Sequence, residues 1–79
     1  MDNSFPTLGA AVLYLNGFHH GKYLGRLNFL ARVNPEWVMT TAQGMHDHKP
    51  IMEHDRHPYA TMLDIAICDR FAEAYNEMH

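Results

Sequence analysis

Residues 22 to 34 read KYLGRLNFLARVN, and this stretch decides the fold that the sequence predicts. On an extended chain, Arg26, Asn28 and Arg32 fall on one face, and apolar or small residues fall on the other. The apolar face holds Tyr23, Gly25, Leu27, Phe29, Ala31 and Val33. A period of two residues is typical of a β-strand with one buried face. We therefore expect a strand over residues 22 to 34.

Two further strands are expected beside this one. Residues 10 to 15 are apolar and end at the turn-forming pair Asn16-Gly17, which favours a hairpin with the strand that follows. Pro35 ends the second strand, and residues 37 to 41 resume a run rich in Trp, Val and Thr, which favour β structure. The sequence thus predicts a three-stranded antiparallel sheet.

The period changes to that of a helix near the C-terminus. From residue 59 to residue 78, apolar residues recur at intervals of three and four, which is typical of an amphipathic helix. Because His57-Pro58 disfavours helix, we expect the helix to start between Pro58 and Met62. Laid across the sheet, it would cover Leu27, Phe29 and Val33. The predicted class is α+β, with one compact domain over residues 1 to 79.

Residues 7 to 15 also fit a second interpretation. Leu8, Val12 and Leu15 lie at helical spacing, so a short N-terminal helix is the alternative to the first strand. The rest of the predicted α+β arrangement is the same in both interpretations.

Histidines are concentrated in residues 46 to 57, which read HDHKPIMEHDRH. His46 and His48 lie two residues apart, and a chain reversal at Lys49-Pro50 would face them toward His54 and His57. Four imidazoles brought together in this way can bind Zn²⁺. However, no cysteine lies nearby, and histidines mixed with charged residues are common on solvated loops. We expect a solvated loop without a cofactor, and zinc binding is the alternative.

Charge and hydropathy narrow the class of partner. The net charge is -3 with histidine neutral, and the acidic residues are concentrated after residue 45. An acidic chain lacks the general attraction to phosphate that most nucleic-acid binding requires, so a nucleic-acid partner is not expected. The apolar run at residues 8 to 15 is too short to span a membrane. The single cysteine, Cys68, fits a reducing compartment, and a cytoplasmic location is expected.

The apolar residues suggest a protein-binding role. One helix cannot cover every large apolar side chain of a three-stranded sheet, and the uncovered residues would form a binding surface. No catalytic signature accompanies them, so we expect a non-enzymatic inhibitor or adaptor that acts on a protein partner or forms a homo-oligomer. Small proteins of this kind are typical of phages and plasmids, where they block host factors. The alternative is a metal-binding module. The expected binding residues are Tyr14, Leu24, Leu30, Trp37 and Met39.

Overall fold

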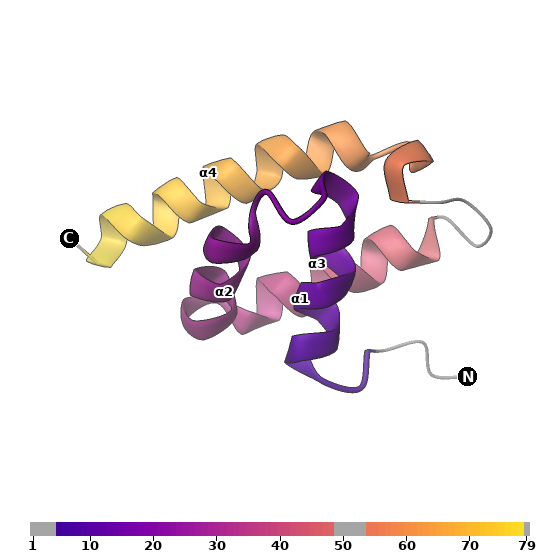
Figure 1. The fold of residues 1–79 in the computed structure, drawn as a ribbon. Helices are drawn as coiled ribbons and strands as arrows, with labels where there is room; N and C mark the ends of the chain where they lie inside the picture. Colours follow the sequence, from indigo (N-terminus) through magenta and orange to yellow (C-terminus); the bar gives the residue numbers. More distant parts are fainter. Residues whose placement is uncertain (1–4, 49–53, 79) are drawn as a thin grey trace.

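A computed structural model describes residues 5–48 and 54–78, and all of its regular secondary structure in these ranges is helical (Figure 1). The predicted α+β class and its three-stranded sheet are wrong, because the described residues contain no strand. In chain order the elements are α1 (Leu8–Asn16), the short 3-10 helix η1 (Gly17–His19), α2 (Leu24–Val33), α3 (Pro35–Asp47), the 3-10 helix η2 (His54–Arg56) and α4 (Ala60–Met78).

The stretch that predicted the central strand forms α2 instead. Leu24 and Leu30 interrupt the alternation, because both are apolar yet fall on the polar face of the expected strand. Helical spacing removes this conflict, since Tyr23, Leu27 and Leu30 are four and three residues apart and all three are buried. Leucine and arginine are also good helix formers. The buried face thus follows the helical period.

The predicted third strand is also helical and belongs to α3. Pro35 occupies the first turn, where proline is favoured because its missing N–H has no partner to lose. Val38, Ala42 and Met45 recur at four and three residues and are buried. The β preference of the Trp37–Thr41 run is therefore overridden by burial of this apolar stripe.

The N-terminal segment forms α1, close to the helical alternative for residues 7 to 15. The Thr7 hydroxyl accepts a hydrogen bond from the Ala10 backbone N–H at 3.0 Å, and thereby caps the helix. The structure has no hairpin at Asn16-Gly17, where the 3-10 helix η1 follows α1 directly. The chain then reverses through His20 and Gly21, which have φ values of 54° and 83°. The helices α1 and α2 therefore lie side by side, joined by a short turn.

The C-terminal helix is confirmed as α4, and it starts at Ala60, within the predicted interval. Leu63 and Ile67 are buried, as the apolar stripe predicts, but they face a helical core in which α4 packs mainly against α2. The C-terminal end of α4 extends past α2 (Figure 1). The buried core consists of Ala11, Val12, Leu15, Phe18, Tyr23, Leu27, Leu30, Val38, Ala42, Met45, Leu63 and Ile67.

Candidate functional site

His57 is buried and fixes the start of α4. Its ring Nδ1 accepts a hydrogen bond from the Tyr59 N–H at 3.0 Å, so the ring proton lies on Nε2. Nε2 then donates to the Met45 carbonyl oxygen at 2.6 Å, which joins the end of α3 to the start of α4. The His57 carbonyl accepts from the Ala60 N–H at 3.1 Å. With both ring nitrogens in hydrogen bonds, His57 acts as a structural residue.

The neighbouring histidines pack against aromatic rings. The His54 ring lies 4.5 Å from the Phe18 ring and 5.0 Å from the Tyr14 ring, measured between centroids. Phe18 also contacts His57 edge-on at 5.3 Å, and His46 lies 5.9 Å from Tyr14. We call Tyr14, Phe18, His46, His54 and His57 the aromatic-histidine cluster. It joins α1 and η1 to the end of α3 and to η2.

The predicted zinc site gains no support from this geometry. Among residues 5–48 and 54–78, no group of three His, Cys, Asp or Glu side chains could hold a metal ion. His48 is exposed and lies against Tyr59 at 4.9 Å, while His57 would have to break two hydrogen bonds to bind a metal. The reversal expected at Lys49-Pro50 lies outside the described residues. Zinc binding therefore stays a prediction.

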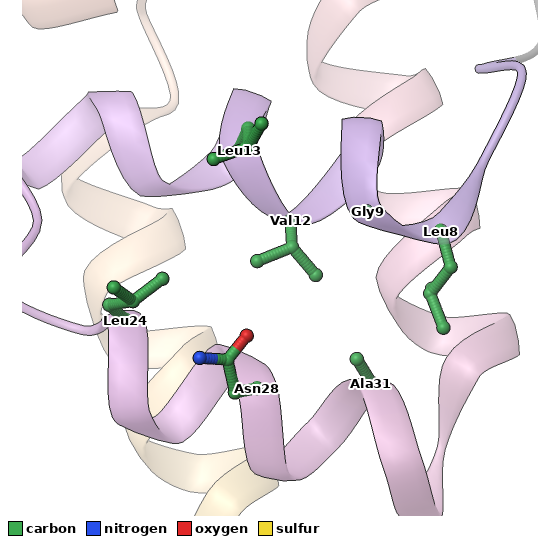
Figure 2. A pocket seen from close by; sticks show the side chains of 7 residues that line it. All are labelled: Leu8, Gly9, Val12, Leu13, Leu24, Asn28 and Ala31. Atoms are coloured by element: carbon green, nitrogen blue, oxygen red, sulfur yellow. The ribbon is translucent and has the colours of Figure 1, made fainter.

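An open apolar groove lies between α1 and α2, and we call it the α1–α2 groove. Its volume is about 360 Å³. Val12 points from α1 toward α2, and Asn28 and Ala31 point from α2 toward α1 (Figure 2). Leu13 and Leu24 flank the groove with 69% and 40% of their surface exposed. The lining residues are Leu8, Gly9, Val12, Leu13, Leu24, Asn28 and Ala31.

The groove lies in a cationic part of an acidic chain. Residues 5 to 35 contain Lys22, Arg26 and Arg32 and no Asp or Glu. All three basic side chains are exposed, and within the described residues none of them pairs with a carboxylate. Arg32 follows Asn28 by one helical turn, so its backbone lies beside this end of the groove, while its guanidinium lies 5.9 Å from the Phe29 ring centroid on the neighbouring face of α2. Because the Arg32 side chain is exposed, an anionic group bound at this end of the groove could draw its guanidinium away from the Phe29 ring.

The face of α2 toward α4 carries titratable side chains, whereas the groove lining has none. The Tyr23 hydroxyl donates a hydrogen bond to Asp64, which raises the pKa of Tyr23 to about 12, with burial and the negative charge of Asp64 adding to the effect. The Cys68 thiol lies 4.0 Å from the same carboxylate. Cys68 is half-buried against the core. Asp64 therefore joins α4 to Tyr23 at the start of α2.

The structure separates the five predicted binding residues. Leu24 lines the groove, whereas Leu30 is fully buried in the core. Tyr14, Trp37 and Met39 are partly buried and pack against the core. The sequence interpretation missed Leu13, and the available signal was its position. On a helix, Leu13 falls away from the Ala11 and Leu15 side.

Comparison with protein-family models, curated proteins and solved structures found no match for this chain. Among the described helices, none combines the length and apolar character needed to cross a membrane.

Proposed function

We propose that this protein is a small protein-binding module, of the inhibitor or adaptor type, that binds a helix of another polypeptide in the α1–α2 groove. The observation that carries the proposal is Leu13, which leaves 69% of its surface exposed beside an apolar groove. Covering Leu13 and Leu24 with apolar side chains of a partner would remove this surface from water, which favours association.

The dimensions of the groove favour a helix as the bound element. On α2 the lining runs from Leu24 to Ala31, which corresponds to about 10 Å along the helix axis. A bound helix places side chains that are three or four residues apart on one face, so about two of its turns would lie along this length. The Asn28 amide could hydrogen-bond a polar group of such a partner.

A small-molecule site or an active site fits the groove less well. Sites for small molecules enclose most of the ligand surface, whereas this groove is open to solvent. None of its seven lining residues has a titratable side chain, so the lining offers no acid, base or nucleophile. A protein surface therefore fits the groove better than a substrate does.

Site-specific photo-crosslinking tests the proposal. A photoreactive phenylalanine analogue is placed at Leu13 or Leu24, and Met78, which is 60% exposed at the far end of α4, serves as the matched control position. In extracts of the native host, we expect one protein to be captured from both groove positions and not from position 78. The same capture should be lost when Leu13→Gln is combined with a crosslinker at position 24. Equal capture at all three positions would contradict the proposal, as would no capture at the groove.

A further inference from the structure

A second exposed apolar surface lies on α4. Met62 and Ile65 are 62% and 59% exposed, and Asp69 and Ala72 are also exposed. These four residues are spaced by three, four and three positions, so they form one stripe on the helix. The stripe lies away from Leu63 and Ile67, which face the core. We call these four residues the α4 stripe.

We propose that the α1–α2 groove binds the α4 stripe of a second copy of this chain, with Asp69 of one copy facing Arg32 of the other. This inference rests on the proposed function, because it names the helix that the groove receives. The protein would then associate with itself in a head-to-tail manner, since groove and stripe are different surfaces.

The spacing of the two surfaces agrees. On the groove side, Leu24, Asn28 and Arg32 follow one another by one turn each and cover about 12 Å. On the stripe, the interval from Met62 to Asp69 covers about 10 Å. With the two helices parallel, Met62 falls beside Leu24 and Asp69 falls beside Arg32. The apolar pair and the charged pair can therefore form in the same register.

Charge also favours this pairing. The groove lies within residues 5 to 35, which carry basic residues and no acidic ones. The helix α4 carries Asp64, Asp69, Glu73 and Glu77 against one basic residue, Arg70. Arg70 already pairs with Glu73 at 3.3 Å, whereas Asp69 has no such partner among the described residues. Opposite charges on the two surfaces would orient the approaching copies.

The α4 stripe of the same chain cannot occupy the groove. Phe29 contacts Phe71 of α4 at 5.2 Å between ring centroids, and Phe29 lies on a different face of α2 from Asn28 and Ala31. The helix α4 therefore packs against α2 on another side from the groove, and only a second molecule can supply a stripe. A contact made by one helix buries less than a standard protein interface, so the association should be weak.

A complementation experiment with purified protein tests the inference. Light scattering at increasing concentration should show a mass above that of the monomer for the parent chain. We expect Leu13→Gln/Leu24→Gln, which alters the groove, and Met62→Gln/Ile65→Gln, which alters the stripe, each to weaken association about tenfold or more. Mixing these two variants should form a 1:1 complex, because one retains the stripe and the other retains the groove. Met78→Gln should behave as the parent does.

A charge exchange tests the register. Arg32→Glu and Asp69→Arg should each weaken self-association, and the variant that carries both changes should recover it, because a Glu–Arg pair then forms in the opposite sense. A parent chain that stays monomeric at millimolar concentration would overturn the inference. So would a mixture of groove and stripe variants that does not associate. Because crosslinking from Leu13 or Leu24 to a different host protein would still support the proposed function, the two proposals can fail separately.

Discussion

The aromatic-histidine cluster and the α1–α2 groove both use residues of α1, but they differ in what covers them. At the cluster, Tyr14 and Phe18 are surrounded by histidine rings from the end of α3, from η2 and from the start of α4. At the groove, Leu13 has no comparable cover. The histidines of the cluster therefore pack against rings of the fold, and His57 is itself buried, whereas the groove, which lacks titratable side chains, provides the open surface. Residue types with reactive side chains do not by themselves mark a functional site.

The largest expected effect concerns Phe18, which is 3% exposed at the centre of the cluster. Phe18→Ala removes a buried ring that contacts three others and should lower the free energy of unfolding by about 3 to 5 kcal/mol. Leu13→Ala at the groove should change it by about 0.5 kcal/mol or less, as exposed substitutions do. Chemical denaturation measures both. Similar losses for the two variants would mean that the groove stabilises the fold as much as the aromatic-histidine cluster does, and the two regions would not differ in this respect.

A smaller loss is expected at His57. His57→Ala leaves the Met45 carbonyl and the Tyr59 N–H without their partner and should lower the free energy of unfolding by about 1 to 3 kcal/mol. His48→Ala is the matched control, because that residue is exposed, and it should have an effect of about 0.5 kcal/mol. Thermal or chemical unfolding distinguishes the two. If His48→Ala were the more damaging change, the cluster would not depend on buried histidine.

Alkaline pH should weaken the contact between α2 and α4. The Tyr23 pKa is 10.0 in an unfolded chain and about 12 in the fold, so the folded state favours the neutral phenol. The stability that this hydrogen bond contributes is present below pH 10 and is lost as the pH rises from about 10 to about 12. Absorbance titration of the phenolate and unfolding curves at each pH measure the effect. Tyr23→Phe should remove this part of the pH dependence, and an unchanged pH profile in the variant would exclude Tyr23 as its source.

The smallest effect is expected from zinc. Because both ring nitrogens of His57 are already in hydrogen bonds, added Zn²⁺ should leave the melting temperature nearly unchanged. Calorimetry and thermal unfolding with and without Zn²⁺ test this expectation. Stoichiometric binding that raises the melting temperature would instead show that the histidines of residues 46 to 57 form a metal site, since a ligand of the folded state stabilises it. His48→Ala/His54→Ala would then abolish that gain.

The C-terminal helix could be predicted from the sequence because charged residues fill the positions between its apolar ones. In α4, Asp64 and Asp69 break any alternation of apolar and polar residues, so a helical period is the one that fits the apolar positions. In α2, by contrast, a two-residue strand period fits most of the apolar residues. A helical period fits every residue that is buried in the structure. Leu24 and Leu30 were the informative exceptions, and a short segment offers few such positions. Tertiary packing then decides between the two periods.

The candidate site could be predicted only in part, for the same reason. On an assumed strand, Leu24 and Leu30 share a face and appear equally uncovered. On the actual helix they are far apart in angle, so Leu24 lines the groove and Leu30 is fully buried. Leu13 was missed because residues 10 to 15 contain no charged residue that would mark the exposed side, which left its position on a helix as the available signal. Assuming a strand period instead of a helical one therefore gave the wrong binding surface, although the apolar residues themselves had been identified.

The projection of α4 past α2 has a practical consequence for handling the protein. The last turns of α4 lie away from α1, whereas α1 begins at Leu8, which lines the groove (Figure 1). An affinity tag or fluorescent label attached after residue 79 would leave the groove accessible. The same addition before residue 5 would start beside the aromatic-histidine cluster, because the Phe5 ring packs against Tyr14 and His46 at 5.1 and 5.8 Å between centroids, and it could disturb that packing. Fusion proteins for interaction screens should therefore be built on the C-terminal side.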